Sequence, residues 1–184
     1  VVSGGGDLAG TVVFKLYVGN ATCDGDADYE SDPIDITTDI TDATCAGDCD
    51  GAADLVVTGG TAPYTFVWSP APPIGQGTAN VSGLCAGPYS VLITDAAGCD
   101  TTVAITITEP LPITADLQVT PAGCGGACDG GASIVVSGGT APYTYEWGPG
   151  TINGQGTDTV TDLCPGSYDV IVTDAAGCTE TFPF

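Results

Sequence analysis

The sequence predicts an all-β protein of two tandem antiparallel β-sandwich domains, preceded by an N-terminal extension strand. Three observations predict this fold class. One block of sequence occurs twice, apolar residues alternate in short runs without a helical period, and the 184 residues include 28 glycines and 13 prolines. Glycine and proline interrupt helices but suit the tight turns between short strands. This content therefore favours a sandwich of the Greek-key type.

The first 32 residues resemble a shortened copy of the repeated block. A β-rich run at residues 11–18 leads to Cys23 much as residues 89–93 lead to Cys99. We expect this run to form a strand that is apolar on both faces, followed by an acidic loop. Its apolar residues on one face are Val12, Phe14, Leu16 and Val18.

The two domains are defined by the repeat itself. Residues 45–99 return as residues 124–178 with 33 identities in 55 positions and no gap. We expect domains at residues 33–111 and 112–184, joined by the short Glu-Pro-Leu-Pro segment at 109–112. Closely spaced prolines favour an extended backbone, so this junction is predicted to be stiff.

Each repeat is predicted to contain five short strands. In the first copy they are residues 53–58, 64–69, 79–82, 89–94 and 101–108, with counterparts in the second copy. The fourth shows clear alternation, because Tyr89, Val91 and Ile93 are separated by single residues. The segments Gly-Gly-Thr-Ala-Pro and Asp-Ala-Ala-Gly are predicted to be turns, in which glycine supplies a positive φ.

The charge of the chain excludes several function classes. It contains 23 acidic residues, one lysine, no arginine and no histidine, giving a net charge of −22. Such a polyanion cannot neutralise phosphates, so we expect no nucleic-acid partner and no anionic membrane partner. A catalytic site that requires histidine cannot be built. No apolar run reaches transmembrane length, so membrane insertion is not expected.

Nine cysteines indicate a disulfide framework in an oxidising compartment. No Cys-x-x-Cys pair or histidine accompanies them, which argues against zinc. The chain has no methionine, so we expect that a leader precedes Val1 or was removed. An extracellular or cell-surface location follows. Four cysteines in each repeat allow three connectivities.

Together, the motifs of both copies resemble the SprB-type repeat of Bacteroidetes surface proteins. The pattern runs from Cys-x₃-Cys-Asp-Gly through Val-x-Gly-Gly-Thr-x-Pro-Tyr-Thr-[Phe/Tyr]-x-Trp to Thr-Asp-x-x-Gly-Cys. The resemblance implies extracellular immunoglobulin-like β-domains of large adhesins and gliding proteins. It implies no enzymatic activity.

The cysteines depart from the usual pattern of that family, which has one at the start of the repeat and one at its end. The additional cysteines come as a pair in each copy, and this paired gain favours two bridges per repeat. The expected bridges are Cys45–Cys99 and Cys49–Cys85, then Cys124–Cys178 and Cys128–Cys164. Cys23 is left over.

The acidic loop is a candidate metal site. Its alternate carboxylates could converge on Ca²⁺, which prefers hard oxygen ligands. An EF-hand is not expected, because Tyr29 stands where that loop requires glycine and no helices flank it. The alternative is a solvated acidic linker. The candidate ligands are Asp24, Asp26, Asp28 and Asp32, with Asp35 at the twelfth position of the loop.

Other candidate residues have structural alternatives. Trp68 and Trp147 could stack on sugars, but a tryptophan after an alternating strand more often fills a sandwich core. The turn aspartates are expected to cap backbone N–H groups, with a junction calcium as the alternative. They are Asp48, Asp50, Asp95, Asp129 and Asp174. Candidate glycosylation sites are Asn20, Asn80, Thr101 and Thr159.

These observations favour a structural subunit of an extracellular filament. The last strand of the second repeat is short at Phe184, and the strand at residues 11–18 lacks a complete domain. Adding the strand of one subunit to the edge of the next would satisfy both, giving a head-to-tail homopolymer. Lys15 could pair with a carboxylate of that neighbour, and the alternative is a solvated side chain. The alternative is an adhesin module that binds surface glycans or a partner protein, and an enzyme is not expected.

Overall fold

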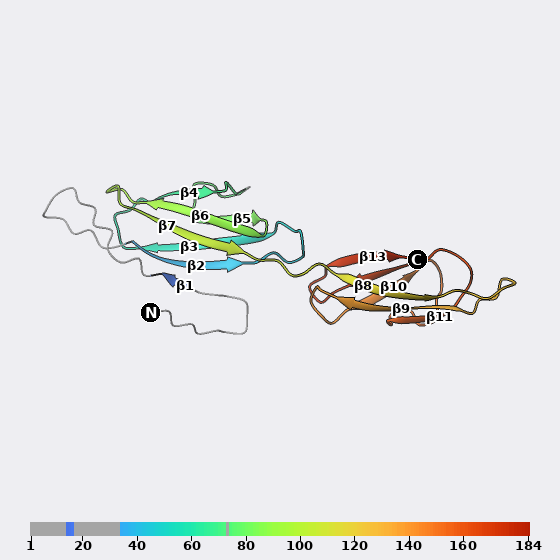
Figure 1. The fold of residues 1–184 in the computed structure, drawn as a ribbon. Helices are drawn as coiled ribbons and strands as arrows, with labels where there is room; N and C mark the ends of the chain where they lie inside the picture. Colours follow the sequence, from blue (N-terminus) through green and yellow to red (C-terminus); the bar gives the residue numbers. More distant parts are fainter. Residues whose placement is uncertain (1–13, 17–33, 73) are drawn as a thin grey trace. The chain divides into compact units, whose positions relative to one another are not determined.

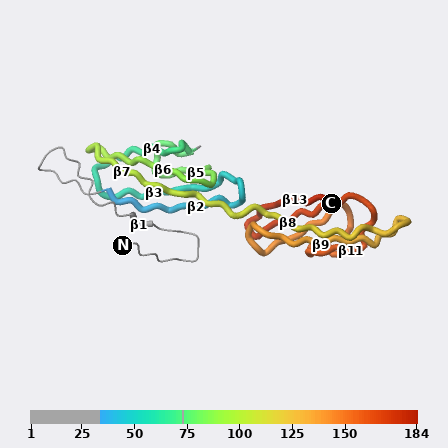
Figure 2. The backbone as a smooth tube through the Cα atoms, in the orientation of Figure 1, coloured from blue at the N-terminus to red at the C-terminus, as the bar shows by residue number. Residues whose placement is uncertain are grey.

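The computed structural model describes residues 14–16, 34–72 and 74–184 of the chain. These residues form strands and turns arranged as four small antiparallel sheets (Figure 1). The chain divides into two compact units. The first contains the described residues up to Ala43 and Gly47–Glu109, and the second contains Thr44–Ala46 and Pro110–Phe184. Figure 2 follows the backbone from blue to green in the first unit and from yellow to red in the second.

The first unit is a sandwich of two sheets. One sheet has the order β1-β2-β3-β5 and the other the order β4-β6-β7. The strands are β1 (Phe14–Leu16), β2 (Asp35–Thr41), β3 (Gly51–Thr58), β4 (Thr65–Ser69), β5 (Asn80–Leu84), β6 (Gly87–Thr94) and β7 (Asp100–Ile107).

The second unit repeats this plan with one strand fewer among the described residues. Its sheets have the orders β11-β9-β8 and β10-β12-β13. The strands are β8 (Thr114–Thr120), β9 (Gly130–Ser137), β10 (Thr144–Gly148), β11 (Thr159–Leu163), β12 (Asp169–Thr173) and β13 (Thr179–Pro183).

Alternating side chains fill each sandwich from both sheets. In β7, for example, Val103, Ile105 and Ile107 are buried while the residues between them are exposed. This alternation follows from the period of two in an extended chain. The fully buried centre of the first unit includes Leu84, and that of the second includes Trp147. The fold class is therefore all-β, as the sequence predicts.

The ten predicted strands correspond to observed strands with shifts of a few residues at their ends. The predicted strand at 53–58 begins at Gly51, and the one at 79–82 covers Asn80–Leu84. Two further strands, β2 and β8, were not predicted. They alternate less clearly, because threonine and aspartate occupy several of their positions. Each forms the outer strand of its repeat in one sheet, as described below.

Candidate functional site

An added strand covers one edge of the first unit. β1 pairs antiparallel with β2, and Phe14, Lys15 and Leu16 lie opposite Thr38, Thr37 and Ile36. Residues 14 and 16 belong to the predicted assembly strand, whereas Val12 and Val18 lie outside the described residues. The edge of this repeat therefore accepts a strand from outside the repeat.

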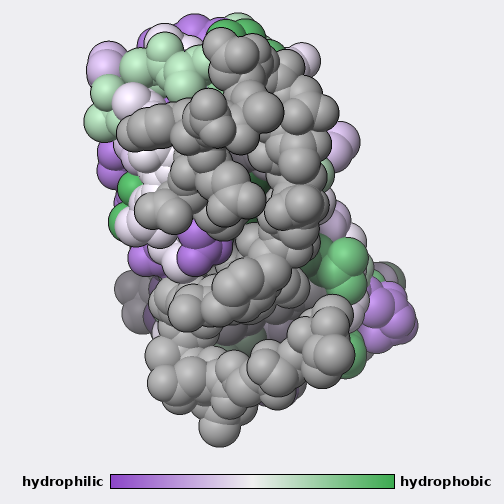
Figure 3. Space-filling model, turned by 90° about the vertical axis from the view of Figure 1, so that its left-hand side faces the viewer, coloured by the Kyte–Doolittle hydropathy of each residue, from purple (hydrophilic) through white to green (hydrophobic). Residues whose placement is uncertain are grey.

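An apolar groove lies beside this ladder, between the two sheets of the first unit. It is lined by β2 and β7, mainly through Ile36, Ile40, Val103 and Ile105. Ile36 and Val103 are otherwise buried core residues. Among the described residues, this groove separates β2 from β7 on the side where β1 joins. On the face drawn in Figure 3, hydrophilic and hydrophobic residues are intermixed among the coloured, described residues.

β8 occupies in the second unit the place that β2 occupies in the first. Each of the seven residue pairs between β2 and β3 recurs, 79 residues later, between β8 and β9. Within the described residues, however, β8 pairs with β9 alone. Its inward-facing Val119 is 48% exposed, whereas the equivalent Ile40 is half-buried. As far as the described residues show, β8 is therefore an uncovered edge that matches the covered one.

In the other sheet of each unit, a glutamine side chain hydrogen-bonds to the backbone of the edge strand, β4 or β10. Gln155 accepts a hydrogen bond from the Trp147 backbone N–H at 2.8 Å and donates to its carbonyl at 3.0 Å. Gln76 makes the same two bonds to Trp68 at 3.3 and 3.4 Å. Each glutamine thus imitates the peptide group of a neighbouring strand. This arrangement gives a role to the repeated Gly-Gln-Gly-Thr motif.

The loop that holds each glutamine depends on glycine. At Gly75, φ is +92°, and a Cβ there would collide with the carbonyl oxygen of Asn80. Gly154 has φ +95° and meets the carbonyl oxygen of Thr159 in the same way. Only a residue without a side chain fits this close approach.

Both tryptophans are core residues. Trp68 and Trp147 are 2% and 1% exposed. Their Nε1–H groups donate to the carbonyls of Thr78 at 2.9 Å and Thr157 at 2.8 Å. A buried ring cannot stack on a sugar from solvent, so the alternative role as a sugar platform does not fit the structure.

The two shorter bridges form as expected. Cys49 is bonded to Cys85, and Cys128 to Cys164, each across a separation of 36 residues. Each bridge joins the loop before the second strand of its repeat, β3 or β9, to the chain just after β5 or β11. The two disulfides therefore connect equivalent elements in the two repeats.

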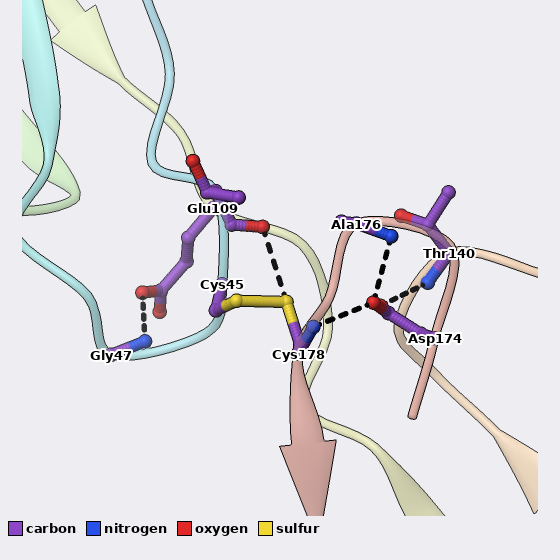
Figure 4. Close-up of a disulfide and its surroundings, with 8 residues drawn as sticks. Cys45, Gly47, Glu109, Thr140, Asp174, Ala176 and Cys178 are labelled. Carbon is purple, nitrogen blue, oxygen red and sulfur yellow. Dashed lines mark hydrogen bonds between the residues drawn. A yellow bond between two sulfur atoms is a disulfide. The ribbon is translucent and has the colours of Figure 1, made fainter. Parts of the chain in front are cut away.

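The other two expected bridges are wrong. Cys45 is bonded to Cys178, with a sulfur–sulfur distance of 2.06 Å, instead of to Cys99 (Figure 4). Cys124, expected to pair with Cys178, is a free and exposed cysteine. Cys99 is disulfide-bonded, but its partner is neither of these two residues.

The pairing of Cys45 with Cys178 has a local cause. Thr44–Ala46 belongs to the second unit although it lies within the first repeat of the sequence. The sulfur of Cys178 contacts the carbonyl oxygen of Thr44 at 3.5 Å (Figure 4). On the other side of this stretch, Gly47 N–H donates to the carboxylate of Glu109 at 2.7 Å. Cys45 is therefore held beside Cys178, which leaves Cys124 without that partner.

Buried aspartates organise the closing turns. The carboxylate of Asp174 accepts N–H groups from Thr140 at 2.8 Å and from Ala176 and Cys178 at 2.9 Å (Figure 4). Asp95 accepts the equivalent bonds from Thr61 and Cys99. The bond from Thr140 is the largest cause that lowers the pKa of Asp174, and the bond from Thr61 does the same for Asp95.

These turn aspartates cap backbone groups, as predicted, and so does Asp129, which accepts Gly123 N–H at 2.6 Å. The candidate calcium ligands Asp24, Asp26, Asp28 and Asp32 lie outside the described residues. Among the residues that are described, no group of three or more Cys, Asp or Glu side chains could hold a metal ion.

The candidate glycosylation residues occupy different environments. Asn80 is exposed and donates to Asp54 at 2.6 Å. Thr159 in β11 is exposed, and Thr101 in β7 is half-buried. Asn20 lies outside the described residues. In the described part of the chain, no helix is long and apolar enough to cross a membrane.

The SprB repeat family matches residues 37–72 and 117–151. The chain carries two SprB repeats. Each matched segment spans three consecutive strands, β2 to β4 in the first unit and β8 to β10 in the second. The matched segments begin within the edge strands β2 and β8, whereas β1 lies outside them.

Other comparisons add little. No curated protein matches the chain. A solved structure described as "Structural basis for Dscam isoform specificity" is similar at a TM-score of 0.28 and 13% identity, covering 72% of this chain. The match spans 39% of that structure's chain. A similarity this low carries no argument about the present protein.

Proposed function

We propose that this SprB-repeat protein is a structural subunit of an extracellular surface fibre, assembled head-to-tail by strand addition. SprB repeats and disulfides together support a secreted surface protein. Disulfides persist in oxidising environments outside the cell. The proposed role is mechanical, with no enzymatic step and no nucleic-acid partner.

The ladder between β1 and β2 carries this proposal. A strand from outside the repeat adds to the edge of a repeat through main-chain pairing. A donor strand at one end and an acceptor edge elsewhere form two different surfaces. Contacts between unlike surfaces propagate from subunit to subunit instead of closing a dimer.

The adhesin alternative shares the support of the SprB repeat match, but the residues expected to contact glycans do not fit that role. Both tryptophans that could have contacted glycans are buried. The most strongly bound carboxylates, Asp95 and Asp174, are occupied by backbone donors. The proposal also includes Ca²⁺ bound by the acidic loop, which would stiffen the fibre. It further includes O-glycans on exposed threonines, which would protect the surface.

The test is to delete residues 1–20 and examine both proteins by electron microscopy, with and without a calcium chelator. We expect fibres from the full chain only, with circular dichroism showing that the shortened chain is still folded. A full-length variant with aspartate at residues 14 and 16 controls for the loss of chain length and should also fail to assemble. Fibres formed by the shortened chain, or a full chain that stays monomeric at every concentration, would overturn the proposal.

A further inference from the structure

We propose that the free edge of β8 accepts β1 of a second copy of this chain, in the register that β1 uses on β2. This inference rests on the proposed strand-addition fibre and names its acceptor. Because β8 and β2 are equivalent strands with equivalent pairing to their inner neighbours, the same strand can occupy the same place on either.

The register assigns three new pairs. On β2, residues 14, 15 and 16 lie opposite Thr38, Thr37 and Ile36. Shifted by the 79 residues of the repeat, these partners become Leu117, Asp116 and Ala115. The only lysine of the chain, Lys15, would thus lie opposite a carboxylate instead of a hydroxyl.

These pairs favour β8 over β2 as the final partner. When β1 leaves one edge for the other, the main-chain hydrogen bonds lost and gained are similar in number. The preference then depends on the side-chain pairs across the ladder, which stabilise a sheet when charges are opposite or both residues are apolar. On β8, Lys15 would pair with Asp116 and Phe14 with Leu117 in place of two threonines, while Leu16 would pair with Ala115 in place of Ile36. The two gained pairs outweigh the smaller apolar contact of Leu16.

The faces of the two strands agree with this register. Asp116 is exposed on the outer face of β8, while Ala115 and Leu117 are half-buried on the inner face. On β2, position 15 lies opposite Thr37, between the buried Ile36 and Thr38. The charged position of β1 therefore meets the solvent face of β8.

The same register explains an exposed apolar residue. Val119 lies two residues beyond the last assigned pair on β8, on the same face as Leu117. Val119 is 48% exposed although it belongs to the inward-facing set of β8. An exposed apolar edge is an interaction hazard unless another strand covers it.

The test is a charge exchange between copies. Lys15→Asp and Asp116→Lys each place like charges opposite one another, so each variant alone should assemble poorly. We expect the critical concentration, measured by sedimentation at low salt, to rise by up to about fivefold. An equimolar mixture should assemble again as an alternating polymer, because each donor then meets an acceptor of opposite charge. The double variant should also assemble alone.

Asp39→Lys is the matched control. It makes the same charge change on the equivalent edge strand β2, outside the three positions that pair with β1. We expect it to assemble like the wild-type chain. Melting temperatures of the Asp39→Lys and Asp116→Lys variants should stay close to the wild-type value, since residues 39 and 116 are exposed.

The outcomes separate the two proposals. If the wild-type chain forms no fibres, the proposed function fails. If it does but both single variants assemble normally, the fibre stands and the assignment of β8 is wrong. A mixture no better than either variant alone would also overturn the assignment, because it would show that Lys15 and Asp116 do not meet between copies.

Discussion

Asp95 and Asp174 show how much a repeated turn depends on one carboxylate. Each is 5% exposed and gathers backbone N–H groups from two segments that are 34 residues apart. A carboxylate that accepts several N–H groups is favoured in its charged form. The Thr-Asp-Ala-Ala-Gly-Cys motif thus ties the closing turn to the Gly-Gly-Thr loop.

Replacing Asp174 by asparagine should lower the melting temperature at pH 7. Asparagine offers one acceptor oxygen and turns an amide group toward N–H donors. The pKa of Asp174 is lowered from 3.8 in the folded protein, chiefly by Thr140 N–H. Its contribution to stability is therefore complete above the unfolded pKa and is lost as the pH falls through the lower folded pKa.

Thermal unfolding followed between pH 7 and about pH 2 checks this prediction. The difference between wild type and variant should shrink at the acid end. Asp39→Asn, at an exposed position, is the control. A difference that stays constant across the whole range would contradict the assigned role.

At the scale of the element, the edges of the sheets decide what each strand can do. Gln76 and Gln155 close the β4 and β10 edges locally. β1 closes the β2 edge, while β8 has no such cover among the described residues. Edges closed by a side chain are unavailable for strand addition, which directs assembly to the remaining ones.

Gln155→Ala should destabilise the second unit by about 1–2 kcal/mol, because two hydrogen bonds to the buried Trp147 backbone are lost. Gln76→Ala should have a smaller effect, since its bonds are longer. Denaturant unfolding of both variants measures the difference. Equal losses, or none, would show that the glutamines do not support their edges.

The strands and the cysteines show how far the sequence could predict the structure. The strand at 89–94 was predictable because its apolar residues alternate, and the Cys49–Cys85 pair because both cysteines recur together. β2 and β8 were missed because aspartates and threonines mask their alternation. The exposed edge of β8 follows from which strands pair, and no local pattern encodes that.

Cys45 was assigned the wrong partner for a related reason. Sequence symmetry suggests that equivalent cysteines behave alike, so a bridge inside each repeat was expected. The structure places Thr44–Ala46 with the second unit. Equivalent residues Cys45 and Cys124 then have different neighbours, one bonded and one free. The disulfide partner of Cys45 is determined by long-range packing, which a repeat pattern does not indicate.

At the scale of the whole molecule, charge opposes assembly. Each chain carries a net charge of −22. Like-charged subunits repel over a distance that falls from about 30 Å at 0.01 M salt to about 8 Å at 0.15 M. One Lys–Asp pair is a small attraction beside that repulsion.

Raising the sodium chloride concentration over this range should therefore promote wild-type assembly. Sedimentation should show a lower critical concentration at 0.15 M than at 0.01 M salt. Light scattering gives the same readout in solution. Weaker assembly at the higher salt would mean that attraction between unlike charges, rather than repulsion, dominates the contact.

The bond between Cys45 and Cys178 also sets how the protein can be dissected. A fragment that begins at residue 112 contains Cys178 but lacks its disulfide partner, Cys45. A fragment that ends at residue 111 contains Cys45 without Cys178. Cutting the chain between its two sequence repeats therefore breaks this disulfide. A recombinant second unit would keep this disulfide only if it also carried Thr44–Ala46.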